Sequence, residues 1–180
     1  MKLSQVLKDV NVKSKYKDVE IKDITADSRQ VEEGYLFVCI KGASFDGHSV
    51  AEEMLQKGAA AVVCEHDLGL ENQVIVEDTR MAYSPICAAF FGNPADSLKL
   101  IGLTGTNGKT TTTFLIKQIL ENIGKKCGLI GTVQNMVGSE IYPAHYTTPD
   151  PYELQSLFRK MVDASCEYCI MEVSSQALAQ

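Results

Sequence analysis

The chain has 180 residues, of which 45% are hydrophobic and 22% are charged, a balance typical of a soluble globular protein. Its net charge of −6 and the lack of a Lys/Arg-rich run argue against a nucleic-acid binder. The N-terminus is polar, and the longest apolar run is far too short to span a membrane. We therefore expect a cytoplasmic protein without a membrane or nucleic-acid partner; a monomer is the default expectation.

Most of the six cysteines lie inside apolar runs, where a thiol behaves as a small hydrophobic side chain. They are Cys39, Cys64, Cys87, Cys127, Cys166 and Cys169. The last two form a C-x-x-C pair, but no second pair or nearby histidine completes a zinc site. We therefore predict structural thiols in a reducing compartment.

The first 95 residues alternate strand and helix patterns, which predicts an α/β domain. The predicted strands are Val19–Ile24, Tyr35–Ile40, Ala59–Cys64 and Val74–Val76. The predicted helices are Met1–Val10, Ser49–Lys57 and Met81–Phe91. Ser49 and Glu52 form a plausible capping box, Gly58 ends that helix, and Pro85 interrupts the last one.

Residues 98–113 read L-K-L-I-G-L-T-G-T-N-G-K-T-T-T-T. Leu98–Leu103 predicts a strand, and Thr104–Lys109 a glycine loop. A helix with one apolar stripe is predicted next. The stripe consists of Phe114, Leu115, Ile116, Ile119, Leu120 and Ile123. In this order of elements, backbone N–H groups and a helix N-terminus converge on phosphate oxygens.

The loop is a shortened variant of the usual P-loop, since Leu103 stands where that pattern has its first glycine. Lys109 would contact the outer phosphates, and the hydroxyl of Thr110 would bind Mg²⁺. A plain glycine turn is the alternative. We favour a nucleoside triphosphate site because strand, loop, Lys-Thr pair and helix all occur in order.

Gly124 is expected to end the P-loop helix, and Cys127–Ile130 predicts the next strand. The segment 131–145 contains glycines and no regular pattern, and we interpret it as a short hairpin. Asp150 suits the N-cap and Pro151 the first position of a further helix. Its predicted apolar face contains Leu154, Leu157, Phe158, Met161 and Val162, and its predicted capping partner is Glu153.

Thr147 and Thr148 precede that helix, where hydroxyl and N–H groups either meet an anion or only shape the turn. Tyr168–Val173 predicts a buried strand that carries one acid, Glu172, near its end. This carboxylate would reach a metal as a Walker-B acid does, or else only cap the polar residues that follow.

At most three parallel strands are supplied by residue 180, too few for a complete nucleotide-binding sheet. We therefore expect the front part of a longer protein. A boundary near residue 95 would separate domains 1–95 and 96–180.

Four motifs resemble one known family. T-G-T-N-G-K-T-T-T is similar to the ATP loop of the Mur ligases and the related folylpolyglutamate synthases. Upstream, D-S-R-Q-V-x-x-G-x-L-F-V-C-I-K-G and D-G-H resemble the uridine-nucleotide domain of these ligases. Downstream, T-T-P-D-P and M-E-V-S-S-Q-A-L resemble the type that adds the third residue of the peptidoglycan stem peptide. The resemblance extends from about Asp27 to Gln180.

The resemblance implies a small α/β UDP-MurNAc-binding domain, followed by the first half of a P-loop, mostly parallel-sheet ATP-binding domain. It implies an ATP- and Mg²⁺-dependent amide ligase that acts through an acyl phosphate. A diamino acid, meso-diaminopimelate or L-lysine, would be joined to UDP-N-acetylmuramoyl-L-alanyl-D-glutamate. We expect the 180-residue piece to be inactive alone.

The resemblance also assigns site residues. ATP would be held by Gly105, Thr106, Asn107, Gly108, Lys109, Thr110 and Thr111, with Lys109 as the catalytic residue. Mg²⁺ would be bound by Thr110 and Glu172. The UDP-MurNAc-peptide would contact Ser28, Ala43, Ser44, Phe45, Tyr146, Thr147, Thr148, Ser174 and Gln180. Many relatives carry His at position 176, so Gln176 is given no metal role.

Two alternatives to the ligase remain open. The P-loop alone would also suit another P-loop NTPase, such as a kinase or a GTPase-like switch, but this leaves the preceding domain and the downstream motifs unexplained. The second alternative is that the chain is a UDP-sugar-binding module without turnover.

Overall fold

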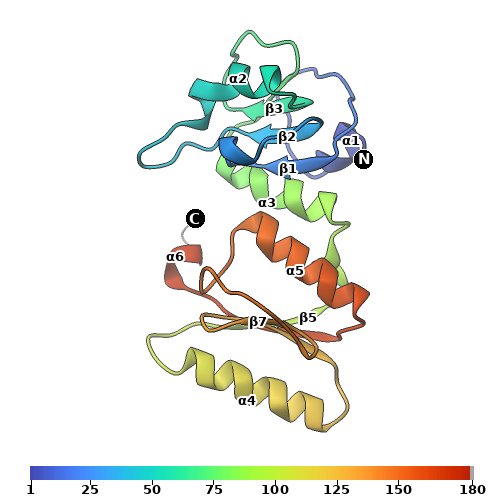
Figure 1. The fold of residues 1–180 in the computed structure, drawn as a ribbon, viewed down its shortest axis with the longest axis vertical. Coiled ribbons are helices and arrows are strands. Elements are labelled where there is room, and N and C mark those ends of the chain that lie inside the picture. Colours follow the sequence, from blue (N-terminus) through green and yellow to red (C-terminus); the bar gives the residue numbers. More distant parts are fainter. Residues whose placement is uncertain (179–180) are drawn as a thin grey trace. The chain divides into compact units, whose positions relative to one another are not determined.

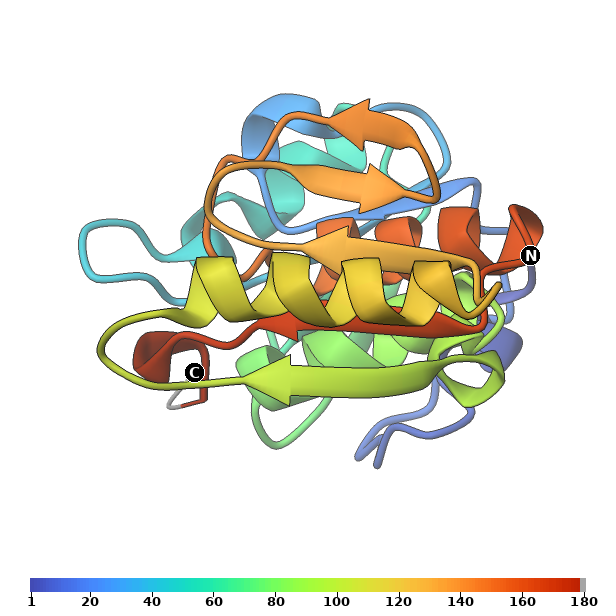
Figure 2. The same cartoon turned by 90° about the horizontal axis from the view of Figure 1, so that it is seen from below.

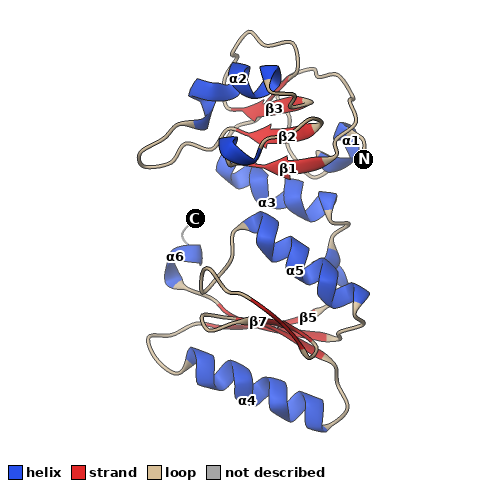
Figure 3. Cartoon of the chain, in the orientation of Figure 1, coloured by secondary structure: helices blue, strands red, loops and turns tan. Residues whose placement is uncertain are grey.

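The computed structural model describes residues 1–178, and the chain divides into two compact units, Met1–Phe90 and Phe91–Gln180 (Figure 1). Each unit combines its own β-sheet with helices (Figure 3), which confirms the predicted α/β class. None of the helices described between residues 1 and 178 has the length and apolar character needed to cross a bilayer.

The first unit is built on a four-stranded parallel sheet in the order β1-β2-β3-β4. Its strands are β1 Asp23–Thr25, β2 Tyr35–Val38, β3 Ala61–Cys64 and β4 Gln73–Ile75. Its helices are α1 Leu3–Val6, α2 Ala51–Gln56 and α3 Thr79–Phe90, with 3₁₀ helices at Ser28–Gln30 and Gly47–Val50. All four residues of β3 are buried, as expected for a central parallel strand covered on both faces.

Two predictions at the start of this unit were wrong in extent. The first helix covers only Leu3–Val6, because the chain then turns and Lys13 N donates to Ile75 O beside β4. The strand predicted at Val19–Ile24 is β1, Asp23–Thr25. It begins late because Ile21 N donates to Met1 O and Val19 O accepts from Leu3 N, so these groups bond the N-terminal segment instead.

The predicted capping box of Ser49 and Glu52 was also wrong. Asp46 caps the 3₁₀ helix Gly47–Val50 by accepting from His48 N at 3.0 Å, and Ser49 Oγ donates to Asp46 O. The α-helix therefore starts only at Ala51, without a side-chain cap. The third helix forms despite the internal Pro85.

The second unit contains a five-stranded sheet in the order β5-β9-β6-β7-β8. Its strands are β5 Lys99–Leu103, β6 Cys127–Ile130, β7 Asn135–Val137, β8 Glu140–Tyr142 and β9 Tyr168–Glu172. Strands β5, β9 and β6 are parallel, and β7 and β8 form an antiparallel hairpin. These pairings confirm the predicted hairpin and the three predicted parallel strands.

Helices α4 Lys109–Asn122 and α5 Pro151–Asp163 cover opposite faces of this sheet (Figures 1 and 2). The short elements are a 3₁₀ helix at Pro94–Ser97 and α6 at Ser175–Leu178. The predicted apolar face of α5 is confirmed, since Leu157, Phe158 and Met161 are buried in the core of the unit.

The predicted apolar stripe of α4 is half-buried at Phe114, Ile116 and Leu120 and exposed at its other positions. Leu115, Ile119 and Ile123 are 53%, 62% and 67% exposed, whereas Thr113 and Lys117 are buried. Helix α4 packs mainly against β6 and β9, and Thr113 and Lys117 are the residues that it buries.

All six cysteines are free thiols and buried, which confirms the structural role predicted for them. Burial raises the pKa of the Cys39 thiol to about 12 and that of Cys127 to about 11. At neutral pH both side chains are therefore protonated and unreactive.

The cap of α5 gives a test of the fold. Asp150 accepts from Glu153 N at 2.9 Å, so Asp150→Ala should lower the free energy of unfolding by about 1 kcal/mol in urea denaturation. The control is Asp163→Ala, which breaks only the exposed pair with Arg159 and should cost less than about 0.5 kcal/mol. Equal losses for the two variants would contradict the capping role.

Candidate functional site

The second unit gathers its polar groups at the carboxyl ends of three parallel strands. Strand β9 lies between β5 and β6, and Figure 2 shows the three arrowheads at the same edge. The glycine loop follows β5, Val173 and Ser174 follow β9, and Gly131 and Thr132 follow β6. Segments distant in the sequence therefore meet at this edge, the usual ligand-binding edge of open α/β sheets.

Glu172 is the centre of this edge. Its side chain is only 1% exposed, and its carboxylate is surrounded by neutral donors. Thr110 Oγ1 lies 3.0 Å from Oε1 and 3.1 Å from Oε2. Thr132 donates its N–H to Oε1 at 3.0 Å and its hydroxyl to Oε2 at 3.1 Å. The structure thus brings together Thr110 and Glu172, the two residues predicted to bind a metal.

Gly131 and Thr132 were missed in the sequence. A Cβ atom at Gly131 would lie 2.4 Å from Glu172 Oε1, so only glycine leaves room for the carboxylate. Their place in the sequence is the signal that could have identified them, because both residues directly follow the predicted strand Cys127–Ile130. The carboxyl end of a parallel strand is where polar ligand-binding groups are expected.

The glycine loop is exposed and turns through two glycines with positive φ. Gly105 has φ +147° and Gly108 has φ +78°, and Gly108 occupies the N-cap position of α4. Lys109 Nζ donates to Gly105 O at 2.7 Å, which holds the ammonium group over the loop. Thr106, Asn107 and Thr111 are exposed at the same helix start. The loop therefore presents a cation and free N–H groups together.

The segment before α5 is attached to the end of β9. Thr148 Oγ1 donates to Glu172 O at 3.0 Å and accepts from Ser174 N at 3.0 Å. Thr147 Oγ1 lies 3.1 Å from Thr132 Oγ1, and Tyr146 is 68% exposed. Three of the predicted substrate contacts, Thr147, Thr148 and Ser174, are thus near Glu172, whereas Gln180 lies outside the described residues.

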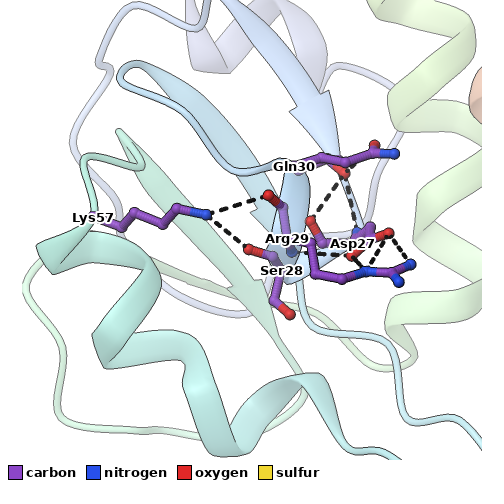
Figure 4. A network of polar contacts seen from close by, with 6 residues as sticks. Asp27, Ser28, Arg29, Gln30 and Lys57 are labelled. Atoms are coloured by element: carbon purple, nitrogen blue, oxygen red, sulfur yellow. Dashed lines mark hydrogen bonds and ion pairs between the residues drawn. The ribbon is translucent and has the colours of Figure 1, made fainter.

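In the first unit, Ser28 begins a 3₁₀ helix that two charged side chains hold in place (Figure 4). Asp27 accepts from Arg29 N at 3.0 Å and pairs with the Arg29 guanidinium. Lys57 Nζ donates to Ser28 O at 3.1 Å. The backbone around Ser28 is therefore fixed by contacts that do not use the Ser28 hydroxyl.

The predicted contacts Ala43, Ser44 and Phe45 form an exposed turn after β2, closed by a bond from Gly42 N to Phe45 O at 2.8 Å. Ser28 follows β1, the parallel neighbour of β2. Both groups therefore extend from the carboxyl edge of the first sheet.

The donor set around Glu172 suits a hard cation. Carboxylate and hydroxyl oxygens are the ligands that Mg²⁺ prefers, and Mg²⁺ usually takes one or two carboxylates with phosphate and water. Among the residues that the structure describes, no three His, Cys, Asp or Glu side chains cluster as a self-sufficient metal site. The residues present thus fit Mg²⁺ that shares its ligands with a nucleotide.

Comparison with known families gives two matches. The Mur ligase middle domain matches residues 103–180, and the catalytic domain of the Mur ligase family matches residues 20–90.

Curated relatives of this chain carry the name UDP-N-acetylmuramoyl-L-alanyl-D-glutamate–2,6-diaminopimelate ligase. The one from Clostridium perfringens is 45% identical over 183 residues, covering 99% of this chain and 38% of the relative. The one from Geobacillus kaustophilus is 51% identical over 162 residues, covering 89% of this chain and 33% of the relative. The chain thus spans little more than a third of the length of these relatives.

Solved structures agree with these matches. A structure of a UDP-N-acetylmuramoyl-L-alanyl-D-glutamate–2,6-diaminopimelate ligase superimposes with a TM-score of 0.80 at 25% identity, covering 99% of this chain and 37% of that one. MurF ligase from Thermotoga maritima in complex with ADP gives a TM-score of 0.59 at 26% identity. This match covers 88% of this chain and 33% of the MurF chain.

The turn around Ser28 predicts a lowered pKa for Asp27 and therefore a pH-dependent contribution to stability. Hydrogen bonds from the Arg29 side chain and backbone lower the pKa of Asp27 below its ordinary 3.8. A lowered pKa stabilises the folded state above pH 3.8, and this contribution is lost as the pH falls through the folded-state pKa. NMR titration of the Asp27 carboxyl carbon should give a midpoint below 3.8, which Arg29→Gln should raise. An unchanged midpoint in that variant would contradict the role of Arg29.

The close approach at Gly131 gives another prediction. Gly131→Ala should lower the free energy of unfolding by about 1–3 kcal/mol, since the new methyl group overlaps the buried Glu172 carboxylate. Gly102→Ala is the control, because its Cβ would lie 3.2 Å from a Val173 methyl group and should cost less. Urea denaturation of both variants measures the difference.

Proposed function

Since its two matched segments make this chain a member of the Mur ligase family, we propose that it forms the UDP-MurNAc- and ATP-binding part of a MurE-type ligase in peptidoglycan precursor synthesis. The first domain, residues 1–95, binds the UDP end of UDP-N-acetylmuramoyl-L-alanyl-D-glutamate, and the second, residues 96–180, binds ATP. The names of the relatives favour 2,6-diaminopimelate as the added amino acid. The protein works as a cytoplasmic monomer.

The proposed reaction is an ATP-dependent amide synthesis. An oxygen of the substrate's terminal carboxylate attacks the γ-phosphorus of ATP, and ADP leaves as the acyl phosphate forms. The amine of the diamino acid then attacks the acyl carbon, inorganic phosphate leaves, and the amine loses a proton. Both steps depend on stabilising negative charge on phosphate oxygens, not on a protein nucleophile.

Each predicted site residue of the second unit has a place in this proposal. The N–H groups of residues 105–111 and the ammonium of Lys109 bind the phosphates. Glu172 and the Thr110 hydroxyl hold Mg²⁺, which when bound offsets the negative charge of the phosphates. Thr147, Thr148 and Ser174 lie at the edge where the substrate's reacting end is expected, with Tyr146 and Gln180 as further contacts.

One observation carries the proposal more than any other. The first threonine after the P-loop lysine bonds the acid at the end of the adjacent strand at 3.0 Å. A P-loop Ser/Thr beside a strand-end acid is the arrangement with which P-loop enzymes hold the magnesium of a nucleotide. A UDP-sugar-binding module without turnover would not need this pair, and another P-loop NTPase would not need the first unit.

A chimera tests the reaction. We expect this chain, joined to the remaining part of the Clostridium perfringens relative, to release phosphate from ATP only when UDP-N-acetylmuramoyl-L-alanyl-D-glutamate and diaminopimelate are both present. Phosphate release at full rate with ATP alone would exclude the ligase. Calorimetric binding of the UDP-sugar but not of ADP would favour the binding module.

Two substitutions in the chimera test the site. Lys109→Ala should lower the rate of phosphate release at least about 100-fold while the affinity for the UDP-sugar peptide stays unchanged. Glu172→Gln should raise the Mg²⁺ concentration for half-maximal rate about tenfold, because the metal loses a charged ligand. Lys126→Ala, which removes an exposed lysine of the same unit, is the control. An unchanged Mg²⁺ requirement in Glu172→Gln would exclude Glu172 as a metal ligand.

A further inference from the structure

We infer that Thr132 is a positioning residue, which orients the Glu172 carboxylate for a divalent cation and links it to Thr147 in the proposed substrate site. The inference rests on the proposed function. No motif in the sequence marks Thr132, and its role follows from contacts of the folded chain.

Thr132 holds both oxygens of the carboxylate. Its N–H bonds Oε1 at 3.0 Å and its hydroxyl bonds Oε2 at 3.1 Å. Two donors from one residue fix the plane of a carboxylate, which a single donor would leave free to rotate. The absence of a side chain at Gly131 allows this approach.

The third donor to the Glu172 carboxylate, the Thr110 hydroxyl, comes from a different element. Thr110 Oγ1 is within 3.1 Å of both oxygens and comes from the helix that follows the glycine loop. Thr132 therefore presents the carboxylate to Thr110 and the loop, where the cation of a bound nucleotide would lie. Donors that orient a metal-binding carboxylate strengthen metal binding without contacting the metal.

Thr132 also bonds the segment that precedes α5. Its Oγ1 lies 3.1 Å from Thr147 Oγ1 and 3.1 Å from Glu172 Oε2. A hydroxyl has one hydrogen and a carboxylate only accepts, so the Thr132 hydrogen points to Glu172. The hydrogen between the two hydroxyl oxygens then comes from Thr147. One chain of hydrogen bonds, Thr147 to Thr132 to Glu172, thus joins the two proposed sites.

The test measures how ADP binding to the 180-residue chain depends on Mg²⁺, by calorimetry. Thr132→Val should raise the Mg²⁺ concentration for half-maximal ADP binding about tenfold, without changing ADP affinity in the absence of Mg²⁺. Thr132→Ser should restore the wild-type dependence because it keeps the hydroxyl. Thr112→Val makes the same change at an exposed position of α4 outside this network and should resemble the wild type.

Two results would overturn the inference. One is an unchanged Mg²⁺ dependence in Thr132→Val, and the other is an equal loss of ADP affinity with and without Mg²⁺. The second would show general damage to the site, because a positioning role affects only the metal-dependent part.

A ligand-free measurement separates this inference from the proposed function. If the wild type binds no ADP, the proposed function fails, and the hydrogen-bond chain is tested by Thr132→Val, Thr147→Val and the double variant. The urea midpoint of the double variant should shift by less than the sum of the single shifts, since either change breaks the same link. Additive shifts would overturn the inference.

Discussion

The second unit depends on one buried carboxylate. Glu172 is almost inaccessible to water, and among the described residues it has no cationic partner, only N–H and hydroxyl donors. Burial of an ionised group costs several kcal/mol unless hydrogen bonds compensate, and each bond to a charged acceptor returns about 1.5–3 kcal/mol. The surrounding threonines and Gly131 are therefore needed to keep this acid inside the protein. A bound cation would complete the compensation.

The strand order explains how these groups meet. Because β9 lies between β5 and β6, the acid at its end has the glycine loop on one side and Gly131-Thr132 on the other. The contacts of Thr148 with Glu172 O and Ser174 N attach the segment before α5 to the same strand end. A parallel sheet with a central acid thus collects groups from four separate segments at one edge.

The features predicted correctly from the sequence are those that depend on residues close together in the chain. The glycine loop, the Asp150 cap, the apolar face of α5 and the hairpin all follow from spacing and capping rules, and the structure contains them. The exposed positions of the α4 stripe were unpredictable, because periodicity identifies an apolar face but not whether a neighbouring strand covers it. Thr132 was missed for a related reason: its partners are 15 and 40 positions away, and only the pairing of β6 with β9 brings them together.

The thiols have a practical consequence. All six cysteine sulfurs lie in the interior, and burial holds those of Cys39 and Cys127 in the protonated form. Alkylating reagents attack thiolates that they can reach, so labelling of the native chain must wait until the polypeptide opens. Cysteines from both units would then report opening of each unit separately, when the modified positions are identified by mass spectrometry. The chain thus carries its own chemical probes of local unfolding.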